Sequence, residues 1–158
     1  MKTAVLFFML AILFPAFVFA ATVDGTPTFS VTVQNSCIFI TTPSLSMIYT
    51  GLGDATGNFK VDIRCNPGLS WTLSFGGGNN ASGGLRRAAN GGNYLSYRLY
   101  KDAGLTQELQ VTANNTISGT GNGTTQATTI YGSVKKADNA GAVSGLVYID
   151  NIIVTCTW

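Results

Sequence analysis

The chain has 158 residues, of which only 10% are charged, and its formal net charge is +2. Because phosphate binding needs a dense basic face, this charge pattern argues against a nucleic-acid partner. The absence of histidine excludes histidine triads, cysteine–histidine dyads and histidine metal ligands.

Residues 1–20 have the composition of a cleaved export signal. Lys2 precedes an apolar run from Ala4 to Phe19, and Ala20 and Ala21 offer a cleavage site. The run is shorter than the roughly 20 residues that a membrane-spanning helix needs. We therefore predict a signal peptide over residues 1–20, followed by one mature domain of roughly 138 residues.

The mature sequence alternates apolar and polar residues and lacks convincing helical periodicity. This alternation predicts strands at residues 29–34, 59–65, 70–75, 94–100 and 130–134, and a long last strand over 145–158. Turn-forming residues separate the strands, including "SGTGNG" at 118–123. The longest gap, residues 76–92, predicts a surface loop with room for a short strand. Regular strands and turns of this kind predict an all-β sandwich or barrel.

Three cysteines, Cys37, Cys65 and Cys156, remain in the mature chain. Cys37 and Cys65 stand at predicted strand ends, and in an exported protein they are expected to form a disulfide. This disulfide closes a loop of about 27 residues and contributes about 3.5 kcal/mol in the chain-entropy model. For Cys156, in an apolar strand, a buried thiol, an intermolecular bridge and a different pairing all stay open.

No arrangement of residues in the sequence predicts catalysis, a metal site or a bound cofactor. The seven carboxylates are well spread, without a close pair for acid–base chemistry. The glycine-rich stretches "GLGDATG" and "FGGGNNASGG" lack the lysine and helix context of a phosphate-binding loop. Arg86 and Arg87 are expected at a solvated loop tip, and sheet packing explains Tyr94, Tyr97 and Tyr100 better than an aromatic ligand platform does.

Five stretches together carry a family resemblance: "NSC", "DIRCNPG", "YRLYKDAG", "TIYGSV" and "GLVYIDNIIVTCTW". With the N-terminal alternation, they resemble the spore coat protein U domain family, which includes the pilin subunits of archaic, Csu-type chaperone–usher pili. The similarity spans essentially the whole mature chain. The resemblance implies that Cys37 and Cys65 occupy the positions of the family's disulfide. Cys156 stands where the family usually has an aliphatic residue.

The resemblance implies an incomplete immunoglobulin-like β-sandwich that lacks one strand. In that family a periplasmic pilus chaperone fills the open groove, and at the outer-membrane usher the N-terminal segment of a neighbouring pilin subunit replaces it. Here the resemblance implies a donor segment over residues 21–34 and a sandwich domain over residues 35–158. The donor residues would be Val23, Phe29, Val31 and Val33. The strand that bounds the groove and meets the chaperone would carry Tyr148, Ile152, Val154, Cys156 and Trp158.

The expected function is therefore that of a structural subunit of a surface pilus, exported through the periplasm and serving adhesion and biofilm formation. One alternative is a self-complete spore or cell-surface coat protein, whose residues 29–34 would pair within their own chain. Another is a carbohydrate-binding adhesin module, although a two-domain tip protein is expected to be about twice as long and to need no donor segment.

Overall fold

The computed structural model describes residues 28–112 and 115–158. The predicted signal peptide over residues 1–20 and the predicted donor residue Val23 lie outside these ranges. The chain divides into two units, residues 1–32 and 33–158, and the sheets belong to the second. The strands are β1 (Cys37–Phe39), β2 (Ala55–Cys65), β3 (Ser70–Phe75), β4 (Arg86–Asn90), β5 (Asn93–Tyr100), β6 (Ile117–Thr120), β7 (Thr125–Val134) and β8 (Val154–Thr157). A single turn of 3-10 helix, η1, spans Lys136–Asp138.

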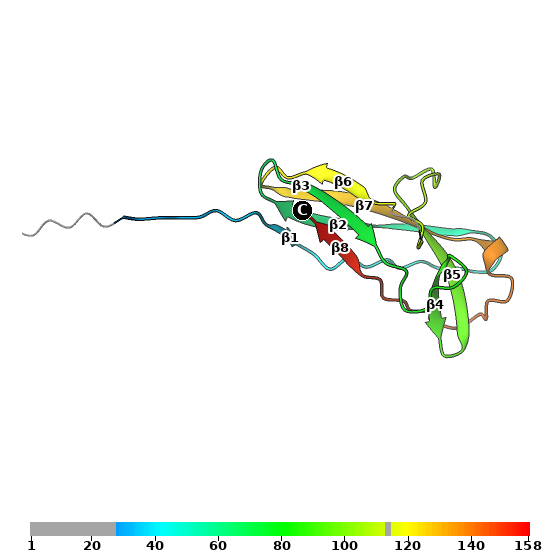
Figure 1. The fold of residues 1–158 in the computed structure, drawn as a ribbon. Coiled ribbons are helices and arrows are strands. Elements are labelled where there is room, and N and C mark those ends of the chain that lie inside the picture. Colours follow the sequence, from blue (N-terminus) through cyan, green and yellow to red (C-terminus); the bar gives the residue numbers. More distant parts are fainter. Residues whose placement is uncertain (1–27, 113–114) are drawn as a thin grey trace, which may run out of the picture. The chain divides into compact units, whose positions relative to one another are not determined.

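The second unit is a sandwich of two antiparallel sheets (Figure 1). One sheet has five strands in the order β1-β2-β7-β5-β4, and the other has three in the order β6-β3-β8. The longest ladder joins β2 to β7, from Ala55 opposite Val134 to Arg64 opposite Thr125. The prediction of an all-β sandwich is confirmed. In the described part of the chain, no helix has the length and apolar character that a membrane crossing requires.

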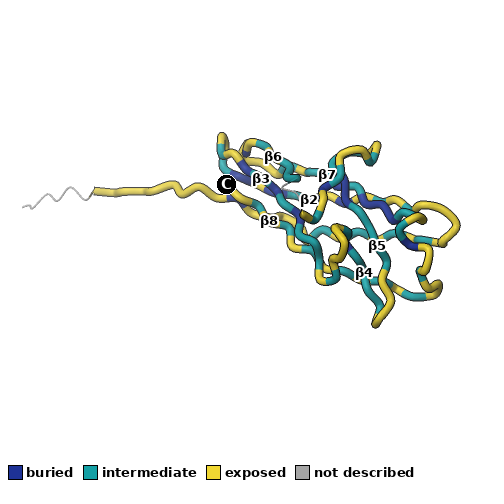
Figure 2. The backbone as a smooth tube through the Cα atoms, turned by 45° about the vertical axis from the view of Figure 1, so that its right-hand side comes forward, coloured by how far each residue is buried: buried dark blue, intermediate teal, exposed yellow. Residues whose placement is uncertain are grey.

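The core forms where the alternating faces of the two sheets meet. On β2 the inward side chains are Val61 and Ile63, both with no exposed surface, and on β3 Leu73 is equally buried. Figure 2 shows these inner strands as the most buried part of the tube. Each such side chain contributes about 1.5–3 kcal/mol by leaving water. The alternation in the sequence predicted these faces correctly.

Several strands differ in extent from the sequence prediction. The gap over residues 76–92 does hold a short strand, β4. In contrast, β6 includes Ser118–Thr120, where a turn was predicted. Gly119 explains the error, because a Cβ at this position would overlap the indole ring of Trp71 on β3. The glycine is therefore a packing position within a strand rather than a turn residue.

The predicted strand over residues 29–34 is not formed. Residues 28–36 have no strand structure, and the first strand begins at Cys37. Sequence alternation alone cannot produce a strand, because the backbone also needs a hydrogen-bonding partner. The edge of β2 is instead paired with the three residues of β1.

Arg86 is also placed differently from the prediction of a solvated loop tip. Its side chain is 1% exposed and donates hydrogen bonds to three backbone carbonyl oxygens: Gly76 at 2.8 Å, Phe75 at 2.9 Å and Leu109 at 2.5 Å. The planar guanidinium can donate to three acceptors at once, and two of these hydrogen bonds are buried. Arg86 thereby ties the end of β4 to the end of β3. Arg87, also in β4, is half-buried: its Nε donates a hydrogen bond to the carbonyl oxygen of Asn80 at 2.7 Å, and its guanidinium lies 4.4 Å from the ring centre of Tyr94.

Candidate functional site: the opening between β1 and β8

The sandwich has four edge strands within the described ranges, β1, β4, β6 and β8, and the candidate site lies between two short ones, β1 and β8. β1 pairs with β2 on one side, and β8 pairs with β3 on one side; within the described ranges neither strand has a second partner. A free edge presents unpaired backbone N–H and C=O groups that can accept another strand. The two edges are close at one point, because the sulfur atoms of Cys37 and Cys156 lie within 4.8 Å of each other.

The apolar side chains along β8 are only half covered. Ile152, Val154 and Cys156 point toward the core cluster but remain partly exposed, and Trp158 is 54% exposed. The adjacent strand β3 buries Trp71, Leu73 and Phe75 almost completely. We call the half-covered region bounded by β1 and β8 the β1–β8 opening.

The segment after β1 continues as extended chain outside any sheet. From position 43 to 50 its residues alternate between half-buried and exposed, the pattern of a strand with one face on a core. Leu45 and Met47 lie over two glycines, Gly57 of β2 and Gly132 of β7, which face each other across the β2–β7 ladder. A side chain at either glycine would displace Leu45 and Met47. The two glycines therefore leave room for this segment on the inner face of the sheet.

The last strand is much shorter than the predicted strand over residues 145–158. β8 covers only Val154–Thr157, and the residues from Asp150 to Ile153 lie outside any strand. The Asp150 carboxylate accepts hydrogen bonds from the Tyr97 hydroxyl at 2.7 Å and from the backbone N–H groups of Asn79 and Asn151 at 2.9 and 3.0 Å. Burial and this hydrogen bond raise the pKa of Tyr97, so its hydroxyl remains a donor.

Tyr148 therefore also lies outside β8. Ile149 forms an isolated bridge with Ala89 of β4, in the other sheet. The Tyr148 hydroxyl donates to the carbonyl oxygen of Val143 and accepts from its N–H, both at 3.0 Å. The predicted edge strand is thus reduced to Ile152, Val154, Cys156 and Trp158, of which Val154 and Cys156 lie in β8 itself.

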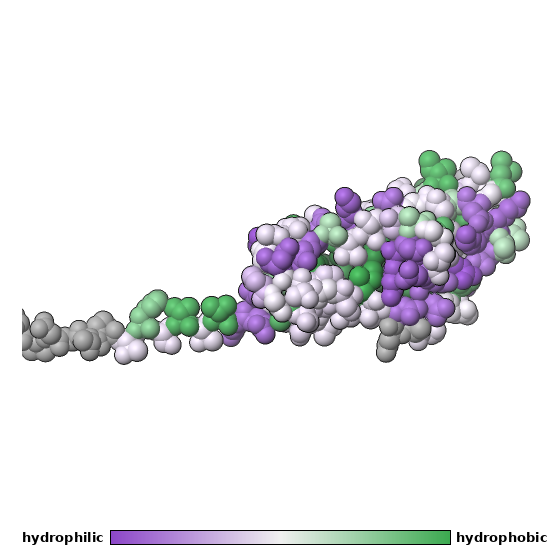
Figure 3. Space-filling view, turned by 90° about the horizontal axis from the view of Figure 1, so that it is seen from above, coloured by the Kyte–Doolittle hydropathy of each residue, from purple (hydrophilic) through white to green (hydrophobic). Residues whose placement is uncertain are grey.

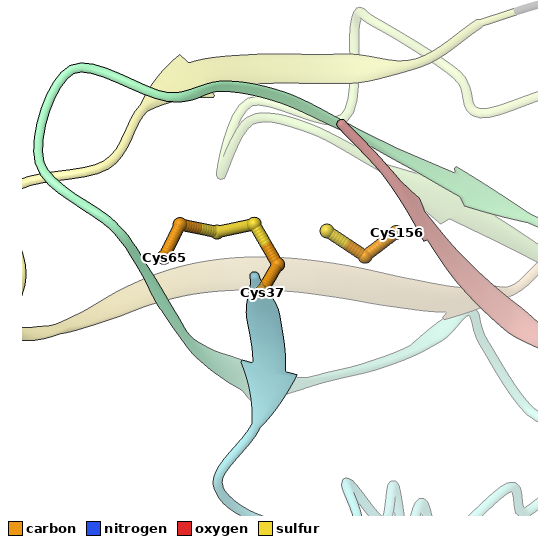
Figure 4. A group of neighbouring side chains, drawn as sticks. All are labelled: Cys37, Cys65 and Cys156. Carbon is orange, nitrogen blue, oxygen red and sulfur yellow. A yellow bond between two sulfur atoms is a disulfide. The ribbon is translucent and has the colours of Figure 1, made fainter. Parts of the chain in front are cut away.

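The three cysteines gather where β1, β2 and β8 approach one another (Figure 4). Cys37 and Cys65 form a disulfide between directly opposed residues of β1 and β2, and Cys156 is a free thiol. Burial raises the pKa of the Cys156 thiol. This sulfur cluster is the one group of potential metal ligands in the described residues, but the disulfide leaves a single sulfur that can ionise and bind a metal.

The carboxylates show one convergence that their spacing in the sequence concealed. Glu108 and Asp138 both pair with Arg98, at 3.1 and 2.9 Å. Paired in this way, they brace β5 against the neighbouring loop and η1 rather than forming an acid–base pair. Sequence reasoning missed this group because the three residues come from separate segments.

Three of the predicted donor residues lie in the described part of the chain, and all three are exposed. Phe29 is 91%, Val31 66% and Val33 83% exposed. Figure 3 shows apolar surface along this stretch. Apolar side chains on alternating positions, without a covering partner, mark a surface that gains free energy when it is covered.

The two sheets and their connections define a pilin-like immunoglobulin fold. The P pilus rod subunit PapA has this fold, with a TM-score of 0.50, 14% identity and coverage of 72% of this chain and 97% of that chain. A second similar structure is the CsuC–CsuE chaperone–tip adhesion subunit pre-assembly complex from archaic chaperone–usher Csu pili of Acinetobacter baumannii. It gives a TM-score of 0.54 at 14% identity, and the match covers 80% of this chain and 40% of that chain.

The sequence also matches a family model. The model of the Spore Coat Protein U domain aligns with residues 23–155, so the chain belongs to the Spore Coat Protein U domain family. This confirms the resemblance drawn from the sequence motifs. No curated protein matches the chain. The chain spans about two fifths of the matched Csu chain, so what that longer protein does is not thereby a property of this one.

Proposed function

We propose that the protein is a structural subunit of a surface pilus that assembles by donor-strand exchange, and that it is not an enzyme. In this proposal residues 21–34 of one subunit enter the β1–β8 opening of the next. Before assembly, a periplasmic chaperone covers the opening and delivers the subunit to an outer-membrane usher. The fibre serves adhesion and biofilm formation at the cell surface.

The observation that carries the proposal is the pairing of exposed apolar residues with a half-covered core on the same chain. Phe29, Val31 and Val33 share one face of an extended backbone and are exposed, while Ile152, Val154 and Cys156 of the edge strand are only partly covered. Both sets have the spacing of alternate strand residues, so one extended segment can lie beside the other.

The energetic gain from such insertion is large. Each donor side chain that moves from water into the core contributes about 1.5–3 kcal/mol. The inserted backbone also pairs with the free edge groups of β8. Without a covering strand, the same edges favour aggregation, which supports the role of a chaperone before assembly.

A single charge at position 31 tests the donor segment. Val31→Asp places an unpaired carboxylate among apolar side chains, at a cost of several kcal/mol to insertion. We expect normal amounts of folded subunit but no fibres, measured by purification of the chaperone-bound subunit and electron microscopy of the cell surface. Thr32→Asp is the matched control, because it adds the same charge to the opposite face of the segment and should leave fibres intact.

Two other outcomes would contradict the proposal. Degradation of the Val31→Asp subunit despite its chaperone would show that residues 29–34 are an internal strand, as in a self-complete coat protein. Fibres at the wild-type level would place the donor residues elsewhere, with Val23 the next candidate.

A further inference from the structure

The free thiol of Cys156 is aimed at the disulfide of its own chain. The three sulfur atoms all lie within 4.8 Å of one another. Figure 4 shows the Cys156 side chain pointing toward the sulfur of Cys37, with the sulfur of Cys65 beyond it. Exchange begins when a thiolate attacks one sulfur of the disulfide, so a thiol close to the bridge is its first requirement.

We propose that Cys156 exchanges with this disulfide and converts the Cys37–Cys65 bridge into a Cys37–Cys156 bridge. The Cys156 thiolate forms a bond to the sulfur of Cys37, and the bond between Cys37 and Cys65 breaks. Cys65 leaves as a thiolate and takes up a proton to replace the one that Cys156 released. The number of disulfides is unchanged, so the step requires neither an oxidant nor a reductant.

The free edges supply the movement that the exchange requires. The sulfur of Cys156 must come from within 4.8 Å to the roughly 2 Å of a covalent bond. β1 has three residues and β8 four, and each strand is held from one side only. Burial raises the pKa of the Cys156 thiol and keeps it mainly protonated near neutral pH, so the exchange is slow there and faster at mildly alkaline pH.

The new bridge would narrow the β1–β8 opening. It joins strands from different sheets, which ordinarily pack about 10 Å apart, whereas a disulfide holds two Cα atoms within about 7 Å. The consequence for assembly rests on the proposed function: a subunit with the Cys37–Cys156 bridge accepts a donor strand less readily. Reciprocally, a bound strand keeps the two edges apart and slows the exchange.

Peptide mapping can follow the exchange because trypsin separates the three cysteines. Cleavage after Lys60, Arg64, Arg86 and Lys136 leaves each cysteine on a different peptide. The full chain is incubated at mildly alkaline pH, and samples taken at intervals are acidified to stop exchange, denatured so that the buried Cys65 is accessible, and alkylated at acidic pH. The labelled peptide is then identified without reduction. We expect the label to move from the Cys156 peptide to the Cys65 peptide.

The matched control moves the thiol to the outer face of the same strand. In the double variant Cys156→Ser, Thr157→Cys the number of thiols is unchanged, but position 157 is exposed and lies on the opposite face from position 156. Loss of proximity should slow transfer by roughly tenfold or more. Transfer at equal rates, a label that stays on Cys156, or a label that appears on Cys37 would each overturn the proposal. The last two results are read from the wild-type chain alone, so they do not depend on whether the variant folds.

A second arm separates this inference from the proposed function. A synthetic peptide with the sequence of residues 28–34 is added in excess before incubation. Slower transfer of the label supports both the exchange and its link to the opening. Transfer that proceeds unchanged, with the peptide bound, would retain the exchange but reject its coupling to donor-strand occupancy. Failure of the peptide to bind would contradict the donor assignment alone.

Discussion

β3 and β8 are neighbours in one sheet and have similar apolar alternation, yet they differ in burial. Leu73 on β3 is fully buried, whereas its partner in the ladder, Cys156 on β8, is partly exposed. β3 has a strand on each side, and β8 has a strand on one side only. Burial here is therefore decided by the number of flanking strands, since the apolar pattern alone would bury both strands equally.

The two sheets are also connected differently at two places: around Arg86, which we call the closed side, and at the β1–β8 opening. On the closed side Arg86 connects the two sheets through three hydrogen bonds to buried or nearly buried carbonyl groups. At the β1–β8 opening the sheets meet through half-covered side chains and the sulfur cluster. The first kind of connection fixes the geometry, and the second leaves room for a further strand. Variants on both sides test this difference.

The largest effect is expected at the closed side, for Arg86→Ala. The change leaves three carbonyl acceptors unpaired, and hydrogen bonds to a charged donor are worth about 1.5–3 kcal/mol each, although not additively. We expect a loss of at least about 3 kcal/mol in the free energy of unfolding, measured by chemical denaturation. Arg87→Ala is the control, with a smaller expected loss of about 1–2 kcal/mol, because it removes one hydrogen bond, to the carbonyl oxygen of Asn80, and the contact with the Tyr94 ring. Equal losses would show that Arg86 is not a connection between sheets.

A matched pair of valine substitutions compares the two sides directly. Val61→Ala on β2 removes two buried carbon atoms and should cost about 2–3 kcal/mol. The same change at Val154 on β8 should cost less than half as much, because that side chain is already partly in water. Denaturant titration of both variants checks the difference.

Filling the β1–β8 opening should reduce the difference in cost between the two valine substitutions. Addition of a peptide with the sequence of residues 28–34 should raise the cost of Val154→Ala toward that of Val61→Ala, since the covered valine then belongs to a closed core. If the two costs are already equal without the peptide, the half-covered face is not an open binding surface.

The sequence predicted features that depend on local alternation. The inward faces of β2 and β3, with Val61 and Leu73, follow from a period of two and from the core on one side of the sheet. Family motifs added the class of fold, because they identify a whole arrangement rather than single strands.

Features that depend on residues far apart in the chain could not be predicted from the sequence. The hydrogen bonds that hold Asp150 come from Tyr97 and Asn79, which are 53 and 71 residues away along the chain. Arg86 is buried because carbonyl groups from other segments surround it, and Gly119 is a strand residue because Trp71 needs the space. None of these contacts leaves a local pattern, so neighbouring residues alone predicted a longer strand, a loop tip and a turn.

The smallest effect concerns the loop that returns the chain to the closed core after β5. The Asp102 carboxylate accepts hydrogen bonds from the N–H of Gln107 at 2.7 Å and from the N–H and hydroxyl of Thr106. These bonds, that of Gln107 first, lower the pKa of Asp102. A lowered pKa stabilises the folded state above the ordinary aspartate pKa of about 3.9, and this contribution is lost as the pH falls through the folded-state value. Asp102→Asn should therefore be slightly less stable than the wild type at neutral pH, and the difference should shrink in acid. Thermal unfolding of both proteins from neutral to acidic pH measures it; a difference that stays constant into strong acid would show that the ionised carboxylate does not hold this loop.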